Sequence, residues 1–298
     1  MNSVADFPAW MAAQQARVEA ALSRWVPADT PAGLGQAMRY AVLDGGKRLR
    51  PLLVLAASQA VLGNDQAALR AACAAELIHA YSLVHDDLPC MDNDVLRRGK
   101  PTAHVRFGEA RALLAGDALQ ALAFELLTPE GEVVPAAMQA ELCRLLARAA
   151  GVQGMAGGQA IDLASVGKAL SEPELRAMHR LKTGALLQAS VRMGVAAGSQ
   201  VPQGARAALD DYGAAIGLAF QVVDDILDTT ADSAELGKTA GKDAAAGKPT
   251  YVSLLGLPAS QALADELCAQ AHQALDASGL PGVAHLRALA DLVVKRQN

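Results

Sequence analysis

Residues 76–102 read ELIHAYSLVHDDLPCMDNDVLRRGKPT, an apolar segment that runs into a dense group of aspartates. The apolar residues before the aspartates recur with a period near 3.6, as expected of a buried helix. Asp86 and Asp92 are too far apart on an unbroken helix to face the same way, and Pro89 disfavours such a helix. We therefore expect the helix to end or bulge here, so that the chain turns Asp92 back toward Asp86.

A second acidic group lies in residues 220–228, FQVVDDILD, inside another helical pattern. Asp224 and Asp228 are one turn apart and share a helix face. Neighbouring carboxylates repel one another, and burying them unpaired is costly. Magnesium offsets that cost, because it takes oxygen ligands and is shared between one or two carboxylates and substrate phosphates. The two clusters therefore predict a magnesium site for a phosphorylated substrate.

Each cluster alone would also fit a helix cap or a solvated turn. That interpretation is weaker here because both clusters interrupt strongly apolar helices. A calcium loop is disfavoured, since the first cluster has no glycine at the sharp turn and no closing glutamate at the required distance.

Basic residues accompany the acidic clusters. Residues 45–51, GGKRLRP, form a glycine turn before a helix start, where Lys and Arg beside backbone N–H groups suit a phosphate. Lys182 and Thr183 interrupt an apolar helix and so lie at its end or face a polar cavity. Residues 235–250 are rich in Gly, Ala and Thr and carry three lysines, as expected of a lid over an anionic substrate. An ordinary solvated surface is the alternative for each segment.

The whole chain predicts one all-α domain spanning residues 1–298. Hydrophobic residues make up 52% and aromatic residues 3% of it, so the core must consist of Ala, Leu and Val. About ten segments show helical periodicity, and no alternating run is long enough for a strand. Pro51 suits a first helical turn, and Ser171 with Glu174 reads as a capping box. The predicted helices cover residues 10–25, 35–43, 51–62, 65–85, 109–127, 136–150, 172–194, 205–227, 260–277 and 283–296.

The bulk properties exclude several classes of protein. The net charge is −5 and no stretch is strongly basic, so we expect neither nucleic acid nor an anionic membrane as a partner. The longest apolar run, residues 51–63, is too short to span a bilayer. The N-terminus has no signal-peptide pattern. The four scattered cysteines fit a reducing cytoplasm, and they are Cys73, Cys90, Cys143 and Cys268.

Taken together, the segments resemble the trans-prenyl diphosphate synthases, and most closely bacterial farnesyl diphosphate synthases. The similarity occurs in the family's order and spans most of the chain. The resemblance implies an isoprenoid synthase fold, which is a helical bundle around a central active-site cavity, and usually a homodimer. The segments that carry it are residues 45–51, 76–102, 114–119 (LAGDAL), 154–163 (GMAGGQAIDL), 182–184, 220–228 and 237–251.

The resemblance also implies a role for individual residues. Three magnesium ions would bridge the allylic diphosphate and be bound by Asp86, Asp92, Asp224 and Asp228, with Asp87 and Asp225 in support. The allylic diphosphate itself would be held by Arg97, Lys182, Thr183, Gln221, Lys238 and Lys248. Isopentenyl diphosphate would be held by Lys47, Arg50, His79 and Arg98. Without the resemblance, His79 would be interpreted as a core histidine.

The implied reaction condenses isopentenyl diphosphate with dimethylallyl and geranyl diphosphate to give (2E,6E)-farnesyl diphosphate, by ionisation, condensation and elimination. Tyr81, beside Ser82 and five residues before the first aspartate, resembles the bulky residue of enzymes that stop at fifteen carbons. The sequence motif DDLPCMDND also occurs in geranylgeranyl diphosphate synthases, which make the alternative product of twenty carbons. Asn93 and Val252 depart from an aspartate and a proline common in relatives, and neither is a proposed metal ligand.

Two further alternatives have distinct sequence signatures. A terpene cyclase would carry an Asn/Ser/Glu motif in place of the second cluster and would lack the GGKRLRP stretch. A non-catalytic partner subunit of another prenyl synthase would have lost aspartates or phosphate-binding residues, and none of these is missing here.

Overall fold

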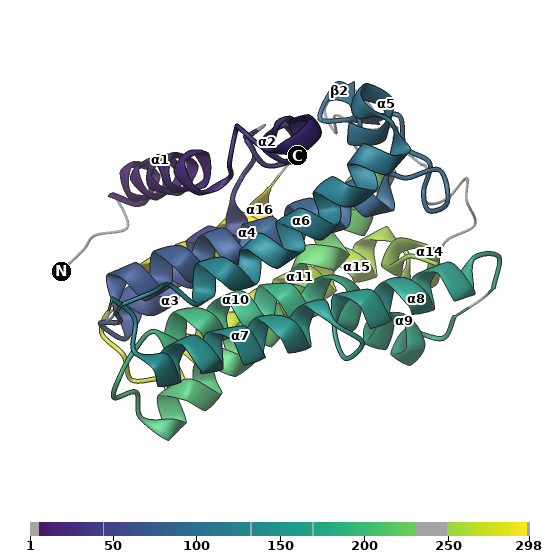
Figure 1. Cartoon of the computed structure of the whole chain (residues 1–298). Helices are drawn as coiled ribbons and strands as arrows, with labels where there is room; N and C mark the ends of the chain where they lie inside the picture. Colours follow the sequence, from purple (N-terminus) through teal and green to yellow (C-terminus); the bar gives the residue numbers. More distant parts are fainter. Residues whose placement is uncertain (1–5, 44, 132, 169, 231–248, 297–298) are drawn as a thin grey trace.

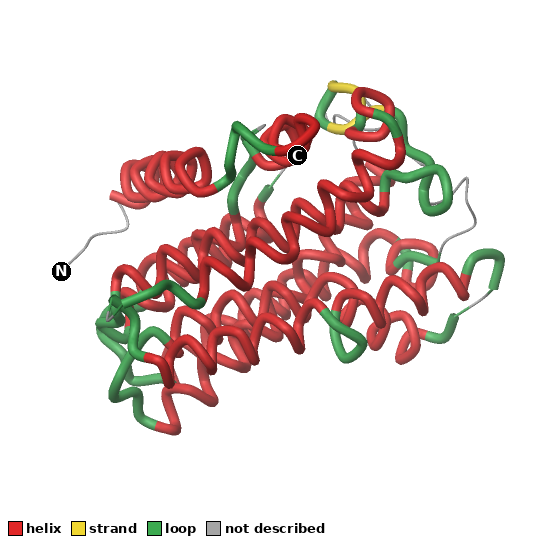
Figure 2. Tube along the Cα trace, viewed as in Figure 1, coloured by secondary structure: helices red, strands yellow, loops and turns green. Residues whose placement is uncertain are grey.

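The computed structural model describes residues 6–43, 45–131, 133–168, 170–230 and 249–296. This part of the chain is helical apart from loops and one small hairpin, as Figures 1 and 2 show. The first half contains α1 (Phe7–Trp25), η2 (Pro31–Gly33), α2 (Leu34–Val42), α3 (Leu49–Ala60), α4 (Asp65–Asp86), β1 (Leu96–Arg97), β2 (Lys100–Pro101), α5 (Ala103–Phe107), α6 (Glu109–Leu127) and α7 (Ala136–Ala150). The second half contains α8 (Met155–Ser165), α9 (Glu172–His179), η3 (Arg180–Gly184), α10 (Ala185–Ala196), α11 (Gln203–Thr230), α14 (Tyr251–Leu255), α15 (Leu257–Ala277) and α16 (Ala284–Lys295).

The long helices run side by side as a bundle (Figure 1). Helix α4 packs between α3 and α6, while α10 packs against α3, α7 and α11, and α15 covers α11. The expected all-α helical bundle is therefore confirmed. It places the ends of α4 and α11, which carry the two aspartate clusters, on the same cavity.

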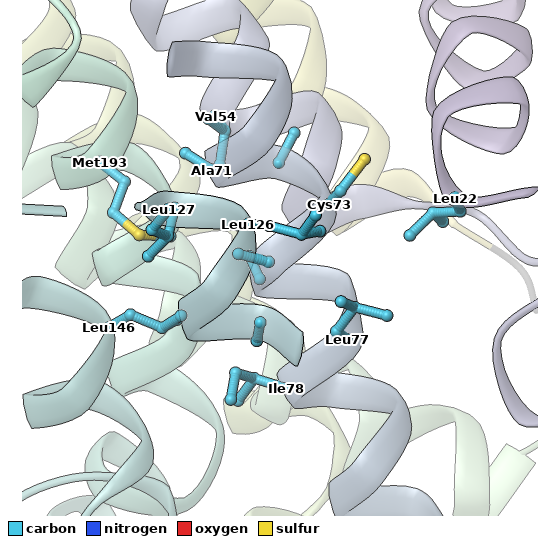
Figure 3. Close-up of a cluster of buried hydrophobic side chains, with 14 of the residues drawn as sticks. Leu22, Val54, Ala71, Cys73, Leu77, Ile78, Leu126, Leu127, Leu146 and Met193 are labelled. Carbon is cyan, nitrogen blue, oxygen red and sulfur yellow. The ribbon is translucent and has the colours of Figure 1, made fainter. Parts of the chain in front are cut away.

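Small apolar residues let these helices approach closely. Most of α4 is buried, and Figure 3 shows Leu77 and Ile78 of this helix inside the cluster that also contains Leu127 and Met193. The many buried alanines of α4 have no rotamer freedom to lose on folding. The core is thus built from Ala, Leu and Val, as the composition requires.

By length and composition alone, helix α4 is also long and apolar enough to cross a membrane. However, 67% of its apolar 18-residue window is buried inside the protein. Such burial is typical of the core helix of a soluble protein.

Most predicted helices are found within about three residues of their predicted ends, in line with the usual uncertainty of boundaries. Pro51 lies in the first turn of α3, and the capping box of Ser171 and Glu174 begins α9, so both predictions are confirmed. Residues 155–165 form a helix that the sequence analysis missed, because two glycines weaken its periodicity.

One expectation was wrong, and one small element was not predicted. The single helix predicted over residues 172–194 is interrupted by the π-helical turn η3 between α9 and α10. A short hairpin does exist, in which Leu96 pairs with Pro101 and Arg97 pairs with Lys100. Its two turn residues, Arg98 and Gly99, both have positive φ, as a tight hairpin turn requires, so turn geometry rather than strand composition forms it.

Candidate active site

The first aspartate cluster forms where α4 ends. The helix stops at Asp86, and the N–H of Asp92 donates to the carbonyl oxygen of Asp86 at 2.8 Å. The predicted turn back toward Asp86 is therefore present. Burial raises the pKa of Asp86 to about 6; the charge of Lys182 opposes this shift, while that of Asp92 adds to it. A cation bound at this cluster would relieve both the burial cost and the repulsion.

The second cluster lies on α11 and faces the same cavity through Asp224. Arg296, directly after α16, donates to Asp224 Oδ1 at 2.9 Å. Asp225 is buried and accepts from Gln221 Nε2 and from the N–H of Tyr251, both at 2.8 Å. Asp225 therefore holds α11 to the start of α14, while Asp228 is buried one turn further along α11.

The cavity between the clusters has a volume of about 630 Å³, within the usual range for a small-molecule site. Its polar lining comes from α3, α4, the β1–β2 hairpin, α8, η3 and α11, and consists of Arg50, His79, Ser82, His85, Asp86, Arg97, Arg98, Gln159, Lys182, Thr183, Gln221 and Asp224. Its apolar lining consists of Tyr81, Leu83, Met91, Met155, Ala156, Ala160, Leu163 and Phe220. The cavity can therefore take a molecule with an anionic head and a hydrocarbon tail.

Tyr81 and Ser82 both line this cavity, as the chain-length assignment requires. The Tyr81 ring is 9% exposed and packs edge-on against His85, with 5.6 Å between ring centroids. Ser82 Oγ donates to the carbonyl oxygen of His79. Packing against His85 keeps the Tyr81 ring in place at the cavity wall.

Lys182 and Thr183 lie in the π-helical turn and reach the cavity. Lys182 Nζ forms an ion pair with Asp162 Oδ2 at 2.5 Å. Thr183 Oγ1 donates to Gln221 Oε1 at 3.1 Å, and Gln221 in turn donates to Asp225. π-helical turns are rare and frequent at functional sites. Here the turn carries two of the predicted phosphate-binding residues.

Glycines let the surrounding backbones meet at this turn. A Cβ on Gly217 of α11 would lie 2.9 Å from the Cα of Gly184, and a Cβ on Gly158 of α8 would lie 2.1 Å from the backbone nitrogen of Lys182. Either atom would clash with backbone, so α8, η3 and α11 can approach this closely only with glycine at these places.

Arg97 and Asp87 form a bidentate pair. Arg97 Nη2 donates to Asp87 Oδ1 at 2.6 Å, and Arg97 Nε donates to Oδ2 at 3.0 Å. Burial raises the pKa of Asp87, and the hydrogen bonds from Arg97 oppose the shift. Asp87 is 3% exposed and thus supports the site by fixing Arg97, which lines the cavity.

A second cavity of about 430 Å³ adjoins the first and shares Arg50, His79, Arg98 and Phe220 with it. Lys47 and Arg296 also line it. Burial lowers the pKa of Arg50 to about 10 and lowers the pKa of His79 well below its ordinary value, so His79 is neutral at pH 7. Within the described residues, Arg50 Nε is buried without a hydrogen-bond partner. Arg48 and Glu76 also line this cavity and neutralise each other, so four basic residues remain whose mutual repulsion favours binding of an anion.

Arg48 does not belong to this group of cations, although it lies in the same glycine turn. Its side chain is 2% exposed and forms ion pairs of 2.6 Å with both Glu76 and Glu19. Its left-handed backbone, with φ of 52°, directs the side chain inward. Arg48, which was not assigned to substrate binding, therefore has a structural role in this turn. Lys238 and Lys248 lie outside the described residues.

The sequence analysis missed two residues of the site. Asp162 is the ion-pair partner of Lys182, and its signal was its place in the GMAGGQAIDL segment. Arg296 reaches the second aspartate cluster from the end of the chain, and nothing in the local sequence indicated this contact.

Comparison with known proteins agrees with this geometry. The family model described as Polyprenyl synthetase matches residues 31–278. A probable farnesyl diphosphate synthase of Bradyrhizobium diazoefficiens is 52% identical over 273 residues, covering 89% of this chain and 81% of that protein. The chloroplastic geranylgeranyl pyrophosphate synthase 9 of Arabidopsis thaliana is 47% identical over 302 residues, covering 100% of this chain and 83% of that protein.

A solved structure gives the same result for the fold. The geranyltransferase of Helicobacter pylori, crystallised with magnesium and isoprenyl diphosphate, superposes with a TM-score of 0.84 at 34% identity, covering 98% of this chain and 97% of that one. Fold and site thus define an all-α isoprenoid synthase. The chain belongs to the polyprenyl synthetase family, among the trans-prenyl diphosphate synthases, and is a prenyltransferase.

Proposed function

We propose that this prenyltransferase adds isopentenyl diphosphate to dimethylallyl and then to geranyl diphosphate, giving (2E,6E)-farnesyl diphosphate. One observation carries the proposal: a cavity faced by both aspartate clusters adjoins a second cavity lined by Lys47, Arg50, Arg98 and Arg296. Two diphosphates could therefore bind side by side, one with metal and one with basic residues alone.

The donor set at the first cavity fits magnesium. Asp86 and Asp92 are brought together by the turn after α4, and Asp224 lines the same cavity as Asp86. Together with Asp228 on α11, these carboxylates would hold the ions, which number three in the family this chain resembles. Bound magnesium would supply charge stabilisation to the departing diphosphate.

Side chains of the protein would bind and position the allylic diphosphate. Lys182 and Arg97 would hold the allylic diphosphate, with Asp162 and Asp87 fixing their positions. Thr183 and Gln221, which are hydrogen-bonded to each other, would contribute to the same diphosphate site. Lys182, moreover, lies beside Asp86, so positive charge meets the leaving group where negative charge develops.

Arg50 and Lys47 would hold isopentenyl diphosphate next to the first substrate, with neutral His79 donating a hydrogen bond. This arrangement would direct the double bond of isopentenyl diphosphate at the allylic carbon. The proton lost afterwards would pass to the released diphosphate. The apolar lining would exclude water, which would otherwise trap the carbocation.

Incubation of the purified protein with isopentenyl diphosphate, dimethylallyl diphosphate and magnesium, followed by dephosphorylation and chromatography, tests the proposal. A fifteen-carbon alcohol that disappears when a chelator is added is expected. A twenty-carbon alcohol would favour geranylgeranyl diphosphate synthase, the second candidate, which the Arabidopsis thaliana relative supports. No product from folded protein would favour the non-catalytic partner subunit.

We also infer a cytoplasmic homodimer in which residues 1–298 form one polyprenyl synthase domain. Helix α6 exposes Leu113 and Leu114 by 46% and 55%. A second copy of the chain would cover this apolar face. Light scattering on the wild type and on Leu114→Arg would test the inference; a wild-type monomer would contradict it.

A further inference from the structure

A groove of about 750 Å³, larger than the candidate active-site cavity, lies between α7, α10 and α11. Helix α10 packs against both α7 and α11 (Figure 1). Apolar residues form much of the groove, including Leu145 of α7, Ala189 of α10 and Leu209 of α11. None of the residues that line it carries a role in the reaction proposed above.

Charged residues surround this apolar floor, and they are mainly basic. The groove is lined by five arginines and two carboxylates, a balance of +3 in a chain whose net charge is −5. Arg144 pairs with Glu141 at 2.6 Å, and Arg192 pairs with Asp210 through two hydrogen bonds. The other three arginines have no carboxylate partner within the described residues: Arg148, Arg180 and Arg206.

Two of these three line the groove from the ends of elements, Arg148 at the end of α7 and Arg180 at the start of η3. Arg148 is in the last turn of α7 and donates to Gln153 at 3.2 Å, a neutral partner. Arg180 begins the π-helical turn and forms no ion pair with any described residue. Guanidinium groups match the oxygens of a phosphate, and the apolar floor that continues from them matches a hydrocarbon chain.

We propose that this groove is a second binding site for an anionic amphiphile, namely an isoprenoid chain with a phosphate or diphosphate head. The head would lie against Arg148 and Arg180, and the chain would follow α10 over Ala189. A phospholipid in a membrane is the other source of this chemistry. It is disfavoured because a chain of net charge −5 is repelled by an anionic surface and because the arginines line a recess.

The groove lies directly behind the candidate active site. Within the five-residue turn η3, Arg180 and Leu181 line the groove, while Lys182 and Thr183 line the active-site cavity. A ligand that pulls on Arg180 therefore acts on the backbone that positions Lys182. An effect of the groove ligand on turnover rests on the proposed function. Because coupling between two binding sites is reciprocal, substrate in the active site would change the affinity of the groove for its ligand by the same factor.

Isothermal titration of the purified full-length protein with farnesyl monophosphate, in the presence of a chelator, tests binding without requiring activity. Arg148→Gln/Arg180→Gln should bind at least tenfold more weakly than wild type. The matched control is Arg176→Gln, which changes an exposed arginine one turn before Arg180 and outside the groove, and should bind normally. Arg50→Gln, in the candidate active site, should leave the groove site intact.

Several outcomes would overturn the proposal. One is equal affinity in the wild type and the double variant; another is loss of all binding in Arg50→Gln. Sedimentation of the wild type, but not of the double variant, with phosphatidylglycerol vesicles would assign the arginines to a membrane. A changed molecular mass of the double variant in light scattering would assign them to a subunit interface.

Hydrogen exchange tests the link to Lys182. Farnesyl monophosphate should slow amide exchange in residues 180–184 of the wild type and not in the double variant, and equal exchange in both would overturn the coupling. Because neither measurement uses turnover, an inactive enzyme would refute the proposed function while leaving the groove site standing.

Discussion

Arg296 Nη2 donates to Asp224 Oδ1 at 2.9 Å, and the Arg296 guanidinium lies 3.9 Å from the centroid of the Phe220 ring. The residue that follows the last helix is thus bound to the second aspartate cluster. Its positive charge stands where the proposed function requires a metal ion. Arg296 and a metal ion bound to Asp224 would therefore compete for the same carboxylate oxygen.

Replacing Arg296 should make the enzyme bind magnesium more readily. In Arg296→Gln, the magnesium concentration for half-maximal turnover should fall by about twofold to fivefold, the loss expected for one partly exposed ion pair. Turnover measured across a magnesium titration at saturating substrate checks this. An unchanged or higher requirement would mean that the pair does not oppose metal binding.

Removing a metal-binding carboxylate should abolish most of the turnover without unfolding the protein. Asp86→Ala and Asp224→Ala should each reduce kcat by about a hundredfold to a thousandfold or more, a range typical of lost electrostatic stabilisation. Asp211→Ala, an exposed aspartate on the same helix as Asp224, is the matched control and should stay active. Near-normal kcat in both site variants, with circular dichroism unchanged, would refute the metal assignment.

Shortening Tyr81 should lengthen the product. The ring lines the cavity and is packed against His85, so Tyr81→Ala would extend the apolar space beyond it. Chromatography of the dephosphorylated products should then show a shift from fifteen to twenty or more carbons. Tyr81→Phe keeps the ring and should keep the product length; an unchanged product in Tyr81→Ala would place the end of the cavity elsewhere.

Arg48 and Arg50 should respond differently to substitution, although they are two residues apart. Arg48→Met leaves Glu76 buried without its ion-pair partner and should lower the free energy of unfolding by about 3 to 5 kcal/mol. Arg50→Gln should mainly raise KM for isopentenyl diphosphate. Denaturant unfolding and steady-state kinetics separate the two effects, and a large KM effect with normal stability in Arg48→Met would reverse the assignment.

Stability should fall in mild acid because of His179. Its side chain is 7% exposed, and burial lowers its pKa to about 4, below the ordinary value of 6.5. As the pH falls, His179 therefore binds a proton in the unfolded chain before it does so in the folded protein. The contribution of neutral His179 to the free energy of unfolding is complete above about pH 6.5, and about 3 kcal/mol of it is lost progressively down to about pH 4. The difference in unfolding free energy between wild type and His179→Gln isolates this dependence. A difference that does not vary with pH would contradict it.

The sequence was most informative where one residue type decides the local structure. Pro89 predicted the end of α4 and the return of Asp92 to Asp86, and the buried alanines predicted a close-packed helical core. The interruption at Arg180 was not predictable, because the spacing of apolar residues continues through it. A π-helical turn changes the hydrogen-bond pattern without leaving a clear mark in composition.

Contacts between distant segments could not be predicted either. Lys47, Arg48 and Arg50 look alike in the sequence, and the difference between them depends on Glu76, more than twenty residues away in α4. The ion pair of Arg296 with Asp224 likewise joins segments that are distant in the sequence. The sequence indicated which residues carry charge, whereas the packing of helices decides which charges neutralise each other.

The three glycines at the crossing of α8, η3 and α11 have a consequence for redesign of this enzyme. Adding even a methyl group at Gly158 or Gly217 would push apart the backbones that position Lys182, whereas the wall around Tyr81 is made of side chains that can be exchanged. We therefore expect directed evolution to alter hydrocarbon length through many routes while leaving the diphosphate end of the site almost invariant. The two halves of one cavity would then accept change at very different rates.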